Sequence, residues 1–192
     1  MIERVLKQNV ETDLERVKIE FGLRVIKNEI PKFVLLFFIF AMWGSIMELL
    51  ALLFFLLPIR TEAGGLHVKT LTGCVVVTLL YCVGIVLLAH FNIPPEIQMG
   101  CLAIAGVLFW RFAPALSRKR QAQISYDREH LRRVILLIFC VDVVTIMVML
   151  RTAPGQFANI GVWTLLIQSL QLPVIQLRRK RENDQETAGV WK

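Results

Sequence analysis

The chain has 192 residues, of which 56% are hydrophobic, and its net charge of +7 comes from Lys and Arg gathered beside apolar runs. This composition argues against an ordinary soluble domain and is typical of a membrane protein. Basic residues in such positions mark a cytoplasmic face next to anionic lipid, so we expect membrane lipid as a partner and no nucleic acid.

The N-terminal region, residues 1–32, carries many charges and places apolar residues at spacings of mostly three to five. This pattern predicts an amphipathic helix, or a pair of helices, that lies on a membrane surface or packs under a helical bundle. The region holds no short apolar core followed by a small-residue cleavage site, so we predict no cleavable signal peptide.

Five apolar runs follow, each near the ~20 residues that span the hydrocarbon layer. We therefore predict an all-α fold: a polytopic helical membrane protein with about five to six membrane segments. In the first run, Gly44, Ser45 and Glu48 favour a broken or re-entrant hairpin, although a single tilted span stays open. The runs cover residues 33–57, 71–91, 96–113, 134–150 and 157–177.

The polar connections predict the orientation. Loop 114–133 and residues 178–181 are rich in Lys and Arg, whereas the turn at 90–96 has neither. The positive-inside rule places the basic segments in the cytoplasm and, counting back through two spans, residues 60–69 with them. We predict an amphipathic region over 1–32, a helical membrane domain over 33–178 with an active-site loop over 58–74, and a basic cytoplasmic tail over 179–192.

The stretch IRTEAGGLHVKTLTGC, residues 59–74, holds His67 and Cys74 seven positions apart. A thiol becomes a nucleophile when a neighbouring imidazole takes its proton or stabilises its thiolate. On one unbroken helix these residues lie about 10.5 Å apart along the axis, too far for comfortable contact. If they work as a pair, the helix must begin after His67, and the preceding loop must fold back over its first turns.

Neighbouring residues suit such a fold. Gly64 and Gly65 reach backbone conformations that other residues rarely adopt. Thr70 or Thr72 is placed to cap the helix that follows, and a helix N-terminus favours the thiolate of a nearby cysteine. From the spacing alone, a buried Cys74 with no catalytic role stays open.

The other reactive residue types give no second motif. Cys82, Cys101 and Cys140 lie in apolar runs without a CxxC pair, so we predict small buried hydrophobes rather than disulfides or zinc ligands. No HExxH sequence is present, and we expect no metal and no cofactor. Glu48 and Asp142 are ionisable groups in apolar runs that either line a path for a peptide or pair with nearby arginines.

The order of residues from Arg60 to Cys74 resembles the signature of the accessory gene regulator B family: a basic residue, a spacer, Ala-Gly-Gly, one residue, His, six residues and Cys. The segments IEFGLRVIKNEI and RFAPALSRKR and the order of apolar runs also resemble this family, so the resemblance covers essentially the whole chain. Members are bacterial membrane endopeptidases that process quorum-sensing pheromone precursors. Thr61 and Glu62 depart from the family pattern, which leaves the contacts to the precursor open.

The resemblance implies a cysteine endopeptidase of the bacterial cell membrane, with Cys74 as nucleophile and His67 as its base. Its substrate would be an autoinducing-peptide precursor, cleaved at the cytoplasmic face through a thioester. An internal cysteine or serine of the substrate would then displace Cys74 and close a thiolactone or lactone. The family also implies a homodimer.

Supporting roles fall on residues around that pair. Three residues match family positions that support the site: Arg60, Gly64 and Gly65. Glu62 is the candidate nearest in the chain to orient His67, although a solvated loop charge is the more ordinary interpretation of Glu62. Candidate oxyanion donors are the N–H groups of Gly73 and Cys74 or of the glycine turn, helped by the Arg60 charge. From the residues alone, a non-enzymatic transporter or sensor accessory subunit stays open.

Overall fold

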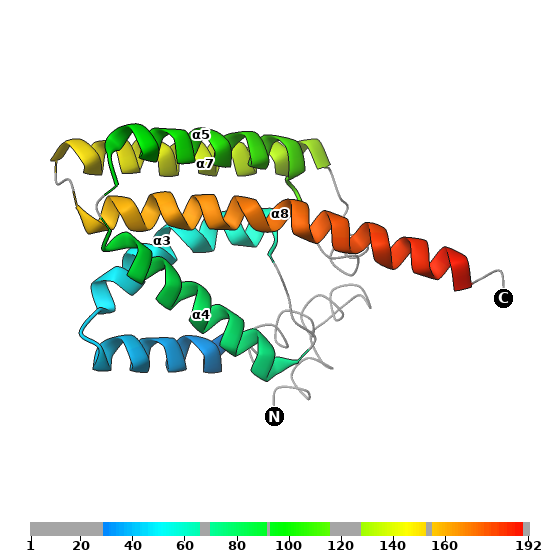
Figure 1. The fold of residues 1–192 in the computed structure, drawn as a ribbon, viewed down its shortest axis with the longest axis horizontal. Helices are drawn as coiled ribbons and strands as arrows, with labels where there is room; N and C mark the ends of the chain where they lie inside the picture. The colour runs from blue at the N-terminus through cyan, green and yellow to red at the C-terminus, as the bar shows by residue number, and fades with distance from the viewer. Residues whose placement is uncertain (1–28, 66–69, 92, 116–127, 153–154, 190–192) are drawn as a thin grey trace, which may run out of the picture. The chain divides into compact units, whose positions relative to one another are not determined.

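The computed structural model describes residues 29–65, 70–91, 93–115, 128–152 and 155–189 (Figure 1). All regular secondary structure in these ranges is helical, which confirms the predicted all-α class. The elements are a helix over 29–42, α3 (Ile46–Ala63), α4 (Leu71–Ala89), α5 (Pro95–Phe112), α7 (Arg128–Thr152) and α8 (Gln156–Gly189).

The first apolar run is broken, as predicted. The helix over 29–42 is followed by a turn at Trp43 and Gly44, and α3 starts at Ile46. Gly44 has a φ of 72°, a region that glycine enters without steric cost. The chain divides into two compact units at this turn, Met1–Gly44 and Ser45–Lys192.

The predicted loop over 58–74 is wrong at both ends, because α3 continues to Ala63 and α4 already begins at Leu71. Pro58 lies inside α3 and does not end it. Phe55, Ile59 and Ala63 are fully buried at intervals of four residues, so one helical face stays packed across the proline. Of the connection, only Gly64, Gly65 and Thr70 belong to the described residues.

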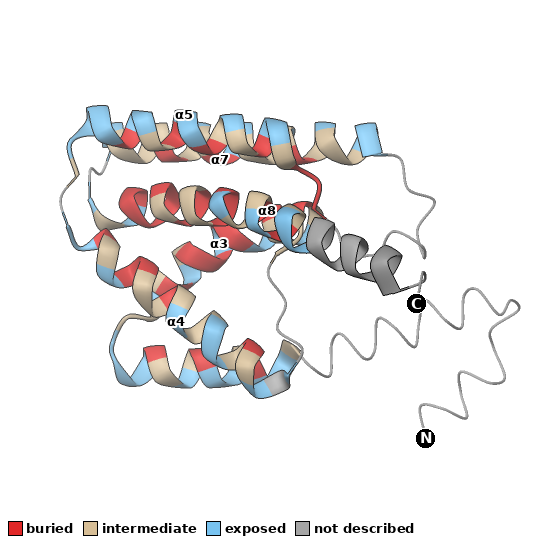
Figure 2. Cartoon of the chain, turned by 45° about the vertical axis from the view of Figure 1, so that its right-hand side comes forward, coloured by how far each residue is buried: buried red, intermediate tan, exposed pale blue. Residues whose placement is uncertain are grey.

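Helix α8 is central to the second unit, since it packs against α3, α4, α5 and α7. Figure 2 shows its first turns largely buried, and α5 and α7 lie side by side along it. The helix does not stop at the predicted start of the tail but continues through Gly189. The core joins residues of α3, α5, α7 and α8, among them Phe55, Phe109, Ile135, Ile146 and Leu165.

Three α8 amides donate hydrogen bonds to carbonyl groups at the C-terminal ends of other helices. Such carbonyls have no partner within their own helix, and in a membrane no bulk water replaces one. Side chains of α8 therefore close the ends of α4, α3 and α5. The bonds run from Asn159 Nδ2 to Ala89 O (3.1 Å) and Phe91 O (3.3 Å), from Gln168 Nε2 to Gly64 O (2.7 Å) and from Gln176 Nε2 to Phe112 O (2.8 Å).

Three helices of the described part are long and apolar enough to cross a membrane: Thr72–Ala89, Arg128–Thr152 and Gln156–Arg178. The expected span 96–113 forms α5, but Glu96, Gln98 and Arg111 lower its hydropathy and it is not among the three. Five to six membrane segments therefore stay a prediction.

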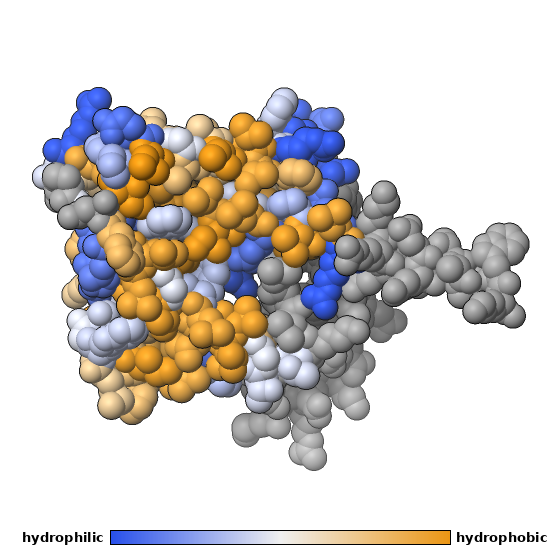
Figure 3. Space-filling view, in the orientation of Figure 1, coloured by the Kyte–Doolittle hydropathy of each residue, from blue (hydrophilic) through white to orange (hydrophobic). Residues whose placement is uncertain are grey.

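The exposed surface is that of a membrane protein. Hydrophobic residues, orange in Figure 3, cover much of the visible face. Helix α7 exposes Leu137, Val141, Val144 and Val148, which share one face at helical spacing. Because soluble monomers rarely expose such stripes, this face of α7 is suited to lipid.

Two predictions about single residues are corrected, and the apolar exterior explains the first. Cys82 is buried as predicted, but Cys101 is half-buried and Cys140 is exposed, since an apolar thiol in a membrane needs no protein cover. Asp142 is buried, and Glu48 accepts a hydrogen bond of 3.4 Å from Gln156. Within the described ranges neither carboxylate forms a salt bridge with an arginine.

Candidate functional site

Cys74 lies in the first turn of α4, and Thr70 places it there. Thr70 is the N-cap with extended backbone angles, and its Oγ1 accepts a hydrogen bond of 3.2 Å from Gly73 N–H. Cys74 N–H donates to Thr70 O at 3.0 Å, the bond that starts the helix. This confirms the predicted capping by Thr70 and the start of the helix between His67 and Cys74.

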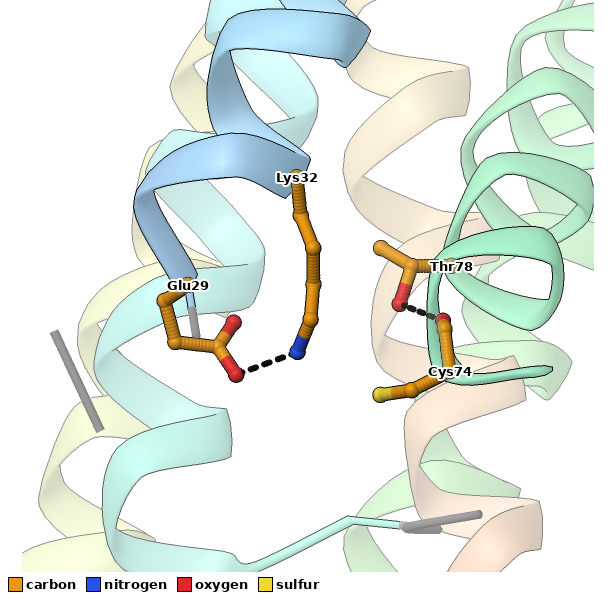
Figure 4. A network of polar contacts seen from close by, with 4 residues as sticks. All are labelled: Glu29, Lys32, Cys74 and Thr78. Carbon is orange, nitrogen blue, oxygen red and sulfur yellow. Dashed lines mark hydrogen bonds and ion pairs between the residues drawn. The ribbon is translucent and has the colours of Figure 1, made fainter. Parts of the chain in front are cut away.

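The same cap engages one of the two predicted sets of oxyanion donors. Because Gly73 N–H and Cys74 N–H both donate to Thr70, neither is available to an incoming carbonyl while the cap is formed. The Cys74 residue is only 8% exposed, and its carbonyl accepts a bond of 2.9 Å from Thr78 Oγ1 (Figure 4). The thiol therefore lies in a site from which most water is excluded.

Figure 4 also draws a polar contact of the first unit, the ion pair between Glu29 and Lys32. The two residues are three positions apart on the helix over 29–42, where opposite charges at this spacing support each other. This pair stabilises its own helix.

The end of α3 is a glycine turn held from two sides. Gly64 has a φ of 87°, and its N–H donates to Arg60 O at 3.1 Å. Ala63 O accepts a bond of 2.9 Å from Ala115 N–H, and Gly64 O accepts the 2.7 Å bond from Gln168. Two segments distant in sequence thus fix a turn whose own residues are conformationally permissive.

The Arg60 side chain lies over Gly65. A Cβ added at Gly65 would lie 3.2 Å from Arg60 Nε, so a larger residue would require the guanidinium to shift by a few tenths of an ångström. The Arg60 charge also interacts electrostatically with Tyr81 and Cys82 of α4. Arg60 and Gly65 are therefore brought together, on the side of α3 that faces α4.

Of the two remaining predicted residues, the structure describes only Glu62. Glu62 is half-buried in the last turn of α3, so it is a helical residue and not a loop charge. His67 lies outside the described residues, and its pairing with Cys74 stays a prediction. His90 cannot replace it, because sixteen residues separate it from Cys74 at the other end of α4, about 24 Å along the axis.

A second polar region, the Asn159 corner, lies where α4 ends. It consists of Asn159, Gln98 and the carbonyls of Ala89 and Phe91, and Gln98 Nε2 donates to Asn159 Oδ1 at 2.8 Å. With Arg151, Gln98 and Asn159 line a cavity of about 480 Å³. Among the described residues, no cluster of three or more His, Cys, Asp or Glu is placed to hold a metal ion.

Sequence reasoning missed Gln168 and Ala115, the two residues that hold the glycine turn. Gln168 gave only a weak local signal, because it is one of several polar residues in the run 157–177. Ala115 acts through its backbone N–H, for which its side chain gives no signal. The stretch RFAPALSRKR was noted, but nothing in it indicated contact with Ala63.

Fold and site together define a helical membrane protein with a cysteine at the start of a membrane helix, preceded in the chain by a fixed glycine turn. The chain matches the family model described as Accessory gene regulator B over residues 1–172, and it belongs to that family. An AgrB-like protein of Clostridium beijerinckii is 23% identical over 166 residues, which cover 84% of this chain and 79% of the relative. No solved structure matches the chain. Membership supports a role in quorum-sensing peptide processing.

Proposed function

We propose that the protein is a membrane cysteine endopeptidase that cleaves an autoinducing-peptide precursor at the cytoplasmic face of the bacterial cell membrane. Cys74 is the nucleophile and His67 its base. The observation that carries this proposal is the position of Cys74, in the capped first turn of a membrane helix that follows the Gly64 turn. Partial positive charge at a helix N-terminus stabilises a thiolate there.

In the first step, the Cys74 thiol passes its proton to His67 and its sulfur attacks the scissile carbonyl. The C–N bond breaks, His67 returns the proton to the leaving amine, and the C-terminal tail departs. The N-terminal part of the precursor remains on Cys74 as a thioester. A thiol or hydroxyl within that part then attacks the thioester carbonyl, releases the Cys74 thiol and closes a thiolactone or lactone.

Arg60 supplies the charge that the oxyanion of each step needs. Its guanidinium lies over Gly65, at the end of the helix that packs against α4. With Gly73 N–H and Cys74 N–H engaged by the cap, a cationic side chain is the strongest remaining donor for a developing negative charge. Low exposure of Cys74 favours ring closure over hydrolysis, because little water reaches the thioester.

The test is release of the C-terminal tail from the precursor peptide by protein in lipid vesicles. Cys82→Ala is the matched control for Cys74→Ala, since Cys82 is also a buried cysteine of α4. We expect release by wild type and Cys82→Ala, and a loss of at least about a thousandfold in Cys74→Ala and His67→Ala. Equal release by wild type and Cys74→Ala would instead support a transporter or accessory subunit.

A further inference from the structure

Like Asn159, Gln168 is buried, and it donates a hydrogen bond of 2.7 Å to Gly64 O, close in length to the 2.8 Å bond from Gln176. Without competing water, a hydrogen bond in such an interior holds its geometry tightly. Gln168 thus constrains the position of Gly64 more strongly than a surface contact would.

The contact also lies deep along α8. Gln168 follows Asn159 by nine residues and precedes Gln176 by eight, which places it about 13.5 Å and 12 Å along the axis from these two. The Gly64 turn is therefore held from the middle part of α8 and not from one of its ends. Displacing the turn would break a buried bond.

One of the two polar atoms of the Gln168 side chain has no partner among the described residues. This atom is Oε1, and it is buried. Buried acceptors without a partner are disfavoured, and Gln98 Oε1 and polar atoms of Asp142, Trp163 and Thr164 share this state among the described residues. The unpartnered Oε1 therefore does not by itself set Gln168 apart, and the role of the residue rests on its bond to Gly64.

We propose that Gln168 is a positioning residue of the peptidase site. By holding Gly64, it fixes the turn that contains Gly65, precedes His67 in the chain and determines where the Arg60 side chain lies. This inference rests on the proposed function. The Nε2 hydrogen bond locks Gly64, and Gly65 then receives the Arg60 guanidinium against its Cα. Without this bond the turn can change conformation, because its glycines do not restrict the backbone.

The experiment compares Gln168→Met with Gln176→Met in vesicles. Each variant removes one α8 amide that donates to the end of another helix, so both are expected to lower the melting temperature. We expect Gln168→Met to lower kcat for tail release about a hundredfold with KM within about twofold, because small displacements of positioning groups act on the chemical step. Gln176→Met should keep kcat within about threefold of wild type.

A second readout separates positioning from stability. The pH dependence of Cys74 alkylation should shift in Gln168→Met and stay unchanged in Gln176→Met, since only the first variant releases the turn that leads to His67. If Gln168→Met fails to fold, Gln168→Asn provides the same comparison, because it keeps a buried amide on a chain one carbon shorter. An expected kcat loss of about tenfold in Gln168→Asn supports the inference, and wild-type kcat overturns it.

The outcomes distinguish this inference from the proposed function. If wild type releases no tail, or Cys74→Ala releases it equally, the peptidase proposal fails. If Cys74 is essential but Gln168→Met and Gln176→Met have the same kcat and the same pH profile, only the role of Gln168 is overturned.

Discussion

The Gly64 turn and the Asn159 corner use the same kind of hydrogen bond for different purposes. In both, an α8 amide donates to carbonyls where another helix ends. Asn159 uses both sides of its amide, since Nδ2 donates to two carbonyls and Oδ1 accepts from Gln98. Gln168 makes one bond and leaves Oε1 unpartnered among the described residues. Gln98 Oε1 in the corner is likewise buried without a partner among the described residues, so the two regions differ in which helix end they hold and not in the completeness of their hydrogen bonds.

The two regions also differ in the backbone conformation at which the helix ends. Helix α4 ends at the Asn159 corner on His90, which has ordinary right-handed angles. Helix α3 ends on Gly64 with a positive φ, followed by a Gly65 that a side chain would crowd. The corner tolerates common residues, while the turn depends on glycine. Substitutions in the turn should therefore impair chemistry, and substitutions in the corner should impair stability.

Of the three substitutions that compare these two regions, Gly65→Ala should have the largest effect. The new Cβ would lie 3.2 Å from Arg60 Nε and displace the guanidinium, so tail release should fall about tenfold to a hundredfold. Gly84→Ala is the control, because a Cβ at that position of α4 meets no atom within 4 Å. Wild-type release by Gly65→Ala would show that the close approach of Arg60 to Gly65 is not needed for the reaction.

At the Asn159 corner, Asn159→Leu should lower the stability of the fold without changing the reactivity of Cys74. The carbonyls of Ala89 and Phe91 lose their donor and Gln98 loses its acceptor, at a cost of about 1–3 kcal/mol for a buried group left unpaired. Thermal unfolding should shift down by several degrees, while Cys74 alkylation in the folded protein keeps its wild-type rate. A slower alkylation at unchanged stability would contradict the division between the two regions.

The smallest effect is expected from Thr70→Val, which removes the cap of α4. Loss of the bond to Gly73 N–H should cost about 1 kcal/mol and slow tail release about threefold, as the first turn around Cys74 loosens. Thr145→Val is the control, since Thr145 bonds a carbonyl in the middle of α7. Equal rates for the two variants would show that the cap does not matter for Cys74.

Local features of the fold were predictable from the sequence. Thr70 was one of the two threonines predicted to cap the helix that carries Cys74, and it stands three residues before the amide that it caps. The end of α3 was not predicted, because a proline and nearby charges suggest a loop at 58. The helix continues since Ile59 and Ala63 are buried against other helices, and that burial depends on long-range packing.

The same limit applies to the site. Gly64 and Gly65 were predicted as the flexible part of the motif, and the structure gives them the special backbone angle and the close Arg60 contact. Gln168, which holds the turn, is 104 residues away from Gly64. An amide in an apolar run indicates a buried polar contact but not its partner, so only the fold identifies that partner.

Intact-mass spectrometry during turnover tests the central claim most directly. Protein in vesicles would be mixed with the precursor peptide and quenched in acid, which preserves thioesters. The account predicts an adduct equal in mass to the N-terminal part of the precursor, located on Cys74, in wild type and Cys82→Ala and absent from Cys74→Ala. An identical adduct on Cys74→Ala, or tail release with no adduct on any cysteine, would contradict Cys74 as the nucleophile.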